Sequence, residues 1–525
     1  MLLLICLVSA AVALLWNLYR WAYPYGINCL QGMNHAPEVP VLGCVLEFVG
    51  KNHVEVSETI WQFEKEYSSP YRATLFNDVH VIIYDAKNAE MLLKDHKNLS
   101  KSHEYDALIQ WFGYGLLTST GQKWFGRRKL LTPAFHFQVL RNFVPIFNEQ
   151  AVVLVSIIDD KLTVARNNDN SAEILVDVTH LMRLLTLDVI CETAMGVQIK
   201  AQQQTSSYIK AIQKFGGVAV ARSLFPWYWN DRIFSMTSLG RETARLIKIM
   251  HEFTQNVIKE RRISRNCDDR QLNTSSLEHE SESSTTTRKR KRQAFLDLLL
   301  DLEERGEINA DGVREEVDTF MFEGHDTTST ALSWALYNIA SHPEVQNQLK
   351  EEIKQVMGDR IDEYPTSEDA ANFKYMECVL KESQRLFPTV PWIGRKLTEP
   401  IKLDKYTLLP GMTANISVLT LHRDPKVFPD PTRFDPTRFD PTRFVQSSSV
   451  SDDLTNPFAF VPFSAGHRNC IGQRFAILEE KIVLIHILRK YRLRTTQKFE
   501  EMKPSMEMVL RPTKGVWITF ESEKL

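Results

Sequence analysis

Paired cysteines are what this sequence of 525 residues lacks most clearly. Its seven cysteines are scattered, and no two of them form a Cys-x-x-Cys pair. An odd, dispersed set argues against a disulfide framework and against a zinc site, and it favours a reducing compartment. An excess of charge of one sign is also lacking, since the formal net charge is −2. Nothing in this balance indicates nucleic-acid binding.

The sequence also lacks a linker that would divide it. At roughly 150 residues per domain its length suggests three or four domains, yet no boundary between separate cores is visible. Hydrophobic residues make up 43% of the chain, which is enough for one large core. We expect a membrane anchor over residues 1–23, a Pro/Gly hinge over 24–50 and one domain over 51–525. A Ser/Thr-rich stretch predicts a mobile polar loop at 265–292 within that domain.

The N-terminus, "MLLLICLVSAAVALLWNLYRW", lacks charge over residues 2–16. A membrane-spanning helix needs about 20 apolar residues, so the run is barely long enough. A cleaved signal peptide is the alternative, but no basic residue precedes the run and its only Ala-x-Ala lies inside it. Arg20 follows the run, and positive residues favour the cytosolic side. We therefore expect an uncleaved anchor with the rest of the chain facing the cytosol.

Helical periodicity dominates the remaining sequence. One helical pattern covers residues 312–340, about 43 Å at 1.5 Å per residue, so it would cross a whole domain. Two short strands flank an Asn77-Asp78 turn. More strands and turns follow Pro388, until a final helix over residues 472–491. The fold class predicted is mainly α with a small β-rich part.

Polar residues interrupt the middle of that long helix, in "FMFEGHDTTS". Glycine costs a helix about 1 kcal/mol relative to alanine, and a buried carboxylate is costly unless it is paired. Gly324 also removes a side chain in the middle of this segment. A core helix interrupted by a glycine and two acids therefore needs an explanation.

Cys470 differs from the other cysteines in its context, "FVPFSAGHRNCIGQRFA". It lies between turn-forming residues and the start of an amphipathic helix. Backbone N–H groups at a helix N-terminus stabilise a thiolate, and Arg468 adds positive charge. Such a thiolate could be a nucleophile or a metal ligand, and no convincing Cys-His-Asn arrangement is visible nearby.

The pattern Phe463-x-x-Gly466-x-Arg468-x-Cys470-x-Gly472 resembles the haem-binding loop of the cytochromes P-450. The resemblance extends in order over nearly the whole chain, through Trp124-x-x-x-Arg128, "GHDT" at residues 324–327 and Glu382-x-x-Arg385. It implies a cytochrome P-450 fold with the long central helix crossing a haem b cofactor. Cys470 would be the axial ligand of the haem iron, a thiolate that favours O–O cleavage.

The same resemblance implies a role for each matching residue. Asp326 and Thr327 would be catalytic and would deliver the protons that O–O cleavage requires. Glu382 and Arg385 would form a structural pair behind the haem. The remaining matches would bind the cofactor: Trp124, Arg128, Phe463 and Arg468. One departure is His467, which stands where the family usually has proline.

Glu323 makes the resemblance more specific, because most members of the superfamily have a small residue at this position. The segment looks like family 4 of the cytochromes P-450, whose glutamate at this position can form an ester with a haem methyl group. A carboxylate that faces water or pairs with a basic residue is the alternative. Family 4 members often hydroxylate the terminal carbon of fatty chains, where orientation must override the strength of the C–H bond.

The function implied is a haem-thiolate monooxygenase of the endoplasmic reticulum membrane that acts on a lipophilic small molecule. Terminal (omega) hydroxylation of fatty acids or related lipids is the first reading, with hormones and foreign compounds also open. NADPH–cytochrome P-450 reductase would supply electrons, with cytochrome b5 as a further partner, and Lys123, Arg127 and Lys129 are candidate contacts. The alternatives are an isomerase or dehydratase of lipid hydroperoxides, and a non-catalytic haem sensor.

A triple repeat departs from the family pattern. The unit Asp-Pro-Thr-Arg-Phe occurs three times within residues 428–444. The family has one such segment, whose arginine docks onto the Glu-x-x-Arg pair. Counting forward from His422 selects Arg438, whereas counting backward from Cys470 selects Arg443. One five-residue unit therefore looks inserted, and both assignments stay open.

Overall fold

The computed structural model describes residues 8–9, 11–16, 26–169, 172–204, 206–277, 294–440, 456–523 and 525. Most of the expected anchor, the repeat arginine Arg443 and residues 278–292 of the expected loop lie outside these ranges. Within them, no helix combines the length and the apolar character that crossing a bilayer requires.

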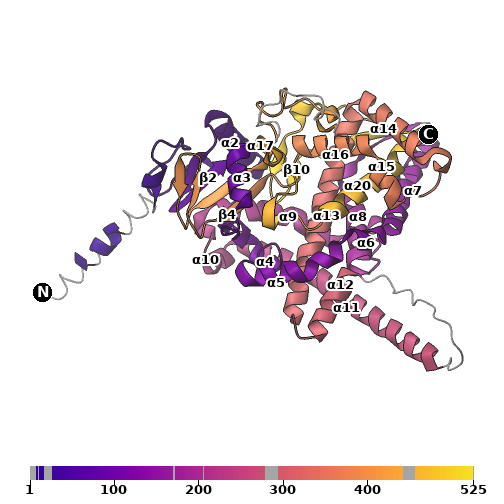
Figure 1. The fold of residues 1–525 in the computed structure, drawn as a ribbon, viewed down its shortest axis with the longest axis horizontal. Coiled ribbons are helices and arrows are strands. Elements are labelled where there is room, and N and C mark those ends of the chain that lie inside the picture. The colour runs from indigo at the N-terminus through magenta and orange to yellow at the C-terminus, as the bar shows by residue number, and fades with distance from the viewer. Residues whose placement is uncertain are drawn as a thin grey trace.

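Helices make up most of the molecule, and the expectation of a mainly α fold with small sheets is confirmed (Figure 1). The shorter helices lie at the periphery of the bundle or join the longer ones. The helices are α2 (His53–Glu66), α3 (Ala86–Lys94), α4 (Asp106–Phe112), α5 (Gly121–Leu131), α6 (Phe137–Arg141), α7 (Val144–Asp169), α8 (Val178–Ile190), α9 (Ser207–Leu224), α10 (Asp231–Met236), α11 (Ser238–Leu277), α12 (Phe295–Glu304), α13 (Ala310–Ser341), α14 (Pro343–Met357), α15 (Ser367–Asn372), α16 (Lys374–Leu386), α17 (Val418–Leu421) and α20 (Gln473–Leu488).

The strands form small sheets, the largest of which lies at the N-terminal side of the helices (Figure 1). Its order is β1-β2-β7-β4, with β2 and β7 parallel and the other pairs antiparallel. A second sheet has the order β3-β11-β8, and two hairpins pair β5 with β6 and β9 with β10. The strands are β1 (Tyr71–Leu75), β2 (Asp78–Ile83), β3 (Glu173–Asp177), β4 (Trp392–Lys396), β5 (Ile401–Leu403), β6 (Tyr406–Leu408), β7 (Thr413–Ser417), β8 (Tyr491–Arg494), β9 (Pro504–Met506), β10 (Leu510–Pro512) and β11 (Trp517–Ser522).

The long helix α13 runs through the middle of the helical part (Figure 1). It starts two residues before the predicted range and ends one residue after it. Asn309 caps it, because its side chain accepts a hydrogen bond from the Gly312 N–H at 2.8 Å. Its neighbours include α8, α16, α11 and α20, so the helix is buried over most of its length.

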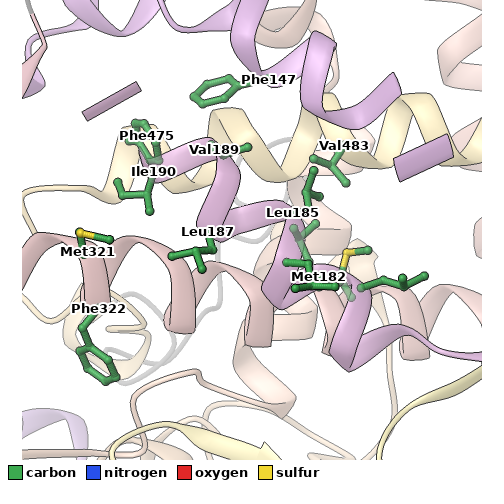
Figure 2. Close-up of a cluster of buried hydrophobic side chains, with 14 of the residues drawn as sticks. Phe147, Met182, Leu185, Leu187, Val189, Ile190, Met321, Phe322, Phe475 and Val483 are labelled. Carbon is green, nitrogen blue, oxygen red and sulfur yellow. The ribbon is translucent and has the colours of Figure 1, made fainter. Parts of the chain in front are cut away.

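The core that holds α13 is a large apolar cluster, and Figure 2 shows a part of it to which four helices contribute. Burying one large apolar side chain stabilises a fold by about 1.5–3 kcal/mol, so such a cluster fixes the helices firmly. It therefore sets the position of α13 relative to α20. The labelled members are Phe147 from α7; Met182, Leu185, Leu187, Val189 and Ile190 from α8; Met321 and Phe322 from α13; and Phe475 and Val483 from α20.

The polar loop expected from residue 265 is wrong in its first part, because helix α11 continues to Leu277. The Ser/Thr-rich composition suggested a loop, but the first turns carry arginines that reach a neighbouring helix. Arg265 donates to the Asp301 carboxylate at 2.7 Å, and Arg261 binds Asp297 through two hydrogen bonds. These contacts tie α11 to α12 and extend the helix beyond its apolar pattern.

The Pro/Gly segment expected as a hinge packs against the main sheet over its described residues. The Ala36 N–H donates to the Arg72 carbonyl at 2.9 Å, and the Cys44 N–H donates to the Thr74 carbonyl at 2.8 Å. Ala36, Cys44 and Val45 are buried. Residues 26–50 therefore belong to the folded domain, because the backbone groups of β1 satisfy theirs.

Candidate haem site

An apolar cavity of about 460 Å³ lies between α13 and the loop that carries Cys470. Its size and its mostly apolar lining with a few polar groups are typical of small-molecule sites. The structure brings seven of the predicted site residues to this cavity: Trp124, Arg128, Glu323, Thr327, Phe463, Arg468 and Cys470. Asp326 does not line it.

Cys470 is exposed to the cavity just before α20 begins. Its N–H donates to the Phe463 carbonyl at 2.9 Å, which closes the loop. Burial raises the pKa of the Cys470 thiol to about 11, Glu323 adds to the rise, and the backbone N–H groups of Gly472 and Gln473 oppose it. A thiolate here therefore needs a cation beside it, which an iron ion would supply.

Gly466 shapes the same loop through its backbone. Its φ is +67°, and a Cβ built on it would lie 1.9 Å from the Leu93 carbonyl oxygen of α3. Only glycine tolerates both conditions without strain. The loop is thus pressed against α3, a contact that the sequence motif did not reveal.

Four cations line the cavity: Lys101, Arg128, Arg395 and Arg468. Arg468 donates to the carbonyls of Leu99 and Leu116 at 3.1 and 3.2 Å and lies 4.4 Å above the Trp124 ring. Arg128 donates to the Asn469 carbonyl and to its side-chain oxygen at 2.9 and 2.8 Å. These arginines therefore bind neutral oxygens, which leaves their charge available.

The four cations fit the two propionates of a haem. In the part of the chain that the structure describes, none of them forms a direct ion pair with a carboxylate. Burial, then the charges of Arg395 and Arg468, hold the pKa of Lys101 well below its ordinary value. A dianionic cofactor would relieve this repulsion. When bound, the haem supplies the redox-active iron that activates O2.

Lys101 and Arg395 were missed by the sequence reasoning. Arg395 ends a stretch that resembles the family, "VPWIGR", but nothing in that motif marked it as a cavity residue. Lys101 has no local signal, because it enters the cavity from the segment before α4. Both reach the site only through packing between segments far apart in the sequence.

Glu323 and Thr327 face the cavity from α13. Burial raises the pKa of the Glu323 carboxyl to about 7, although Lys101, Arg128 and Arg468 act against the rise. The Thr327 hydroxyl donates to the Glu323 carbonyl one turn earlier. Gly324 lies between them, and a Cβ there would come within 2.5 Å of the Ile190 side chain. A larger residue at position 324 would therefore displace the end of the Ile190 side chain of α8.

Asp326 points away from the cavity into a buried ion pair. Arg511 of β10 donates to both oxygens of its carboxylate, at 3.0 and 2.8 Å. Burial would raise the pKa of Asp326, but Arg511 outweighs it and holds the pKa below its ordinary value. Arg511 also donates to Glu507 at 3.0 Å, and Glu507 lines the cavity. Arg511 and Glu507 therefore connect Asp326 to the cavity, and the sequence reasoning missed both of these residues.

The Glu-x-x-Arg pair is buried on α16 as the motif implied. Arg385 donates to both oxygens of Glu382, at 2.7 and 2.8 Å. The Arg438 guanidinium lies 3.4 Å from Glu382, and Arg438 belongs to the second repeat unit. Arg443, from the third unit, lies outside the described residues.

The basic residues suggested as reductase contacts differ in exposure. Lys129 is exposed, and Lys123 pairs with Glu315 at 2.9 Å while staying largely exposed. Arg127 is buried and lies 3.8 Å from Glu316, so it is not a surface contact. The sequence left open whether these residues contact a reductase or belong to an ordinary solvated helix face, and the structure turns Arg127 toward Glu316 of α13.

The cavity is lined by four cations, with Cys470 on one side and helix α13 on the other. This combination of features is that of the haem-thiolate class of proteins. The family model for cytochrome P-450 matches residues 34–520. Cytochrome P-450 4V2 of Rattus norvegicus is 39% identical over 97% of this chain and 94% of its own length. Cytochrome P-450 4c3 of Drosophila melanogaster is 40% identical over 83% of this chain and 78% of its own length.

A third relative, cytochrome P-450 4d2 of Drosophila melanogaster, is 35% identical over 97% of both chains. The chain belongs to family 4 of the cytochrome P-450 superfamily. It is therefore a monooxygenase of the microsomal type with a haem-thiolate cofactor, and the resemblance stated above is confirmed.

Proposed function

We propose that this enzyme hydroxylates the terminal carbon of fatty acids or related lipids. The observation that carries the proposal is the lining of the apolar cavity. Besides Cys470 and residues of α13, the lining includes apolar side chains of α2 and β1, among them Ile60, Phe63 and Ala73. An extended hydrocarbon chain could lie along these residues with one end beside Cys470. Orientation would then select the terminal C–H bond over weaker internal ones.

We also propose that Glu323 attaches the haem covalently through an ester with a haem methyl group. Glu323 faces the cavity, and its pKa of about 7 leaves a substantial carboxylate fraction at neutral pH. The ester replaces a methyl C–H bond by a C–O bond, a two-electron oxidation for which turnover with O2 and reductase supplies the oxidant. The displaced proton would leave to solvent. A fixed haem would hold the substrate end in one orientation.

For proton delivery, we propose that Thr327 acts at the cavity and that Asp326 supplies it. Thr327 lines the cavity, and Asp326 is linked to it along the same helix. Arg511 and Glu507 connect Asp326 to His53, whose side chain is 45% exposed and lies 3.8 Å from Glu507. A change in these contacts would let Asp326 take up a proton from solvent and pass it toward Thr327.

Family 4 membership implies a reductase as electron donor. We propose NADPH–cytochrome P-450 reductase, with cytochrome b5 as a second donor, and Lys123 and Lys129 as contacts. We further propose an anchor within residues 1–23 that holds the domain on the cytosolic face of the endoplasmic reticulum.

The test is a substrate screen with the purified full chain and reductase, scoring terminal against internal hydroxylation. Medium- and long-chain fatty acids should give mainly the terminal alcohol. Predominantly internal products from every chain tested would overturn the proposal. For the ester, protein that has turned over is denatured in acid and the haem is extracted. Haem should stay on the wild type and be released from Glu323→Ala, and complete release from both would contradict the link.

A further inference from the structure

A second polar cluster lies beside the cavity, away from Cys470. Asp78 and His80 come from β2, and His103 begins the short helix that precedes α4. One ligand atom from each of the three lies within 4.8 Å of the other two. Glu104 follows His103, and its carboxylate lies 3.4 Å from His80. His80 and Glu104 also line the cavity.

The atoms that face one another in this cluster make no hydrogen bonds. His80 is 4% exposed, yet its Nε2 has no hydrogen-bond partner among the described residues. The same holds for His103 Nδ1 and Glu104 Oε2. Asp78 Oδ2 lies 2.8 Å from His103 Nδ1 and 3.5 Å from His80 Nε2 without hydrogen-bond geometry to either. These atoms therefore face one another as ion pairs, and buried polar atoms that lack hydrogen bonds are rare and need a reason.

The opposite edges of the two imidazoles are held by other groups. His103 Nε2 lies 3.3 Å from the Ser223 carbonyl, which can accept its proton and leave Nδ1 as a lone pair. His80 Nδ1 lies 3.4 Å from Glu104 Oε1 and 3.1 Å from Asn415. Lys396 binds the other Asp78 oxygen, Oδ1, at 3.0 Å. Such outer contacts orient the ligands of metal sites in this way.

We propose that Asp78, His80 and His103 bind one divalent transition-metal ion, Zn²⁺ in the first place, with water in the fourth position. Two imidazoles with a carboxylate oxygen are a common zinc set. Tetrahedral zinc with bonds of about 2.0–2.1 Å spaces its ligand atoms about 3.4 Å apart. Asp78 Oδ2 lies 2.8 Å from His103 Nδ1 and 3.5 Å from His80 Nε2. The set contains no cysteine, so the scattered thiols do not bear on it.

The ion would connect three segments around the cavity. β2 supplies Asp78 and His80, the short helix supplies His103, and the Ser223 carbonyl belongs to the end of α9. The site is therefore a structural clamp on this part of the cavity wall. It would order the wall without touching the haem pocket around Cys470.

A network without metal is the competing arrangement. Burial disfavours an imidazolium, but Asp78 and Glu104 outweigh it and raise the pKa of His80 to about 10. His103 and Lys396 are the other charged groups that face this pair. A proton on His80 would then stand where the ion is proposed, so metal binding must displace it.

The test titrates the untagged, haem-loaded full chain with Zn²⁺ after dialysis against a chelator. Bound zinc per haem is measured by mass spectrometry of the elements and affinity by calorimetry. One Zn²⁺ should bind per haem. His80→Gln and His103→Gln should each weaken binding by at least about 10-fold. His96→Gln is the matched control, since His96 is an exposed histidine outside the cluster, and its affinity should not change.

Zinc that binds the wild type, His80→Gln and His103→Gln equally would come from surface sites and would overturn the proposal, as would no stoichiometric binding. The carbon-monoxide difference spectrum checks that each variant holds its haem. Where a variant fails this check, zinc X-ray absorption of the wild type decides. Two imidazole ligands with N/O bonds at about 2.0 Å support the site, and a sulfur ligand excludes it.

Discussion

Glu323 and Asp326 lie three residues apart on α13, and their carboxyl groups have opposite surroundings. Both terminal nitrogens of Arg511 donate hydrogen bonds to the Asp326 carboxylate, and this contact keeps the pKa of Asp326 below its ordinary value. Burial raises the pKa of Glu323 to about 7, and three cations act on it without a direct hydrogen bond among the described residues. One helix therefore holds a permanent anion beside an acid that titrates near neutral pH.

The difference shows that the partner, and not burial alone, sets the charge of a buried acid. A carboxylate that Arg511 holds as an anion has no proton of its own at neutral pH, so it can serve the cavity only by accepting a proton from solvent and passing it on. An acid that is partly neutral suits a cavity in which a dianionic haem competes for the same cations. The proposed roles of the two residues can be separated by variants that change one partner at a time.

Arg511→Leu should produce the largest effect, because it leaves the Asp326 charge buried and unpaired. Breaking a buried ion pair from one side typically costs 3–5 kcal/mol, so we expect a loss of about that size. The measurement is urea unfolding of the haem-loaded protein, followed by the haem absorption band. Lys514→Leu is the control, since Lys514 is exposed close by in sequence. A loss below about 1 kcal/mol would mean that Asp326 does not depend on Arg511.

Asp326→Asn should lower product formation by about 100-fold, which is the lower end of what general acid catalysis contributes. The amide keeps the shape of the side chain but cannot accept a proton from solvent and pass it on. NADPH consumption should fall less than product formation, so the ratio of product to NADPH is the measurement. Glu323→Gln should keep a near-normal ratio. Equal loss in both variants would remove the distinction between the two acids.

Glu323→Gln should change how stability depends on pH in protein isolated before any turnover. The folded state keeps the Glu323 proton up to a pKa of about 7, whereas the unfolded chain releases it near the ordinary glutamate pKa of 4.5. Stability should therefore fall as pH rises from about 4.5 to about 7 and then level off. One pKa unit corresponds to about 1.4 kcal/mol of unfolding free energy. Because solvent in the cavity screens Glu323, we expect a total loss of about 2 kcal/mol over this pH range.

Unfolding at a series of pH values measures this slope. Glu64, Glu316 and Asp318 also have pKa values raised to about 7 by burial, so they contribute to the slope of the wild type. Glu323→Gln should therefore have a slope that is smaller by the share of one titrating group, and Asp326→Asn should keep the slope of the wild type. A slope in Glu323→Gln equal to that of the wild type would show that Glu323 does not titrate in this range. The opposite pKa shifts of the two carboxyl groups would then be supported only for Asp326.

Local patterns predicted those features that depend on neighbours in sequence. The apolar period of α13 predicted its ends within two residues, and the Cys470 motif predicted the loop because turn and helix start follow each other. The Arg511–Asp326 pair joins residues 185 positions apart, so no spacing could predict it. Lys101, Arg395 and the histidine cluster share that origin. Gly324 was expected to make room for oxygen, whereas the contact that a Cβ would meet is Ile190 of α8.

Composition misled in two places for a related reason. Residues 265–277 and 26–50 looked like loop and hinge because they are rich in polar residues or in Pro and Gly. In the structure, arginines of α11 reach α12, and the Pro/Gly segment bonds to the backbone of β1. Composition indicates the structure that a segment would adopt in isolation. Contacts with residues elsewhere in the chain decide the structure that it adopts in the folded protein.

Arg438→Ala should give the smallest effect, and it extends the comparison to a third acid. Glu382 already has two hydrogen bonds from Arg385, and Arg438 adds a contact at 3.4 Å. Losing one partner of a satisfied carboxylate should cost about 1 kcal/mol of unfolding free energy. Arg433→Ala is the control, since Arg433 holds the same place in the first repeat unit, is exposed and contacts Arg385 only through its carbonyl. It should stay within about 0.5 kcal/mol of the wild type. Equal losses in these two variants, or a larger loss in Arg443→Ala, would move the docking arginine to another repeat unit.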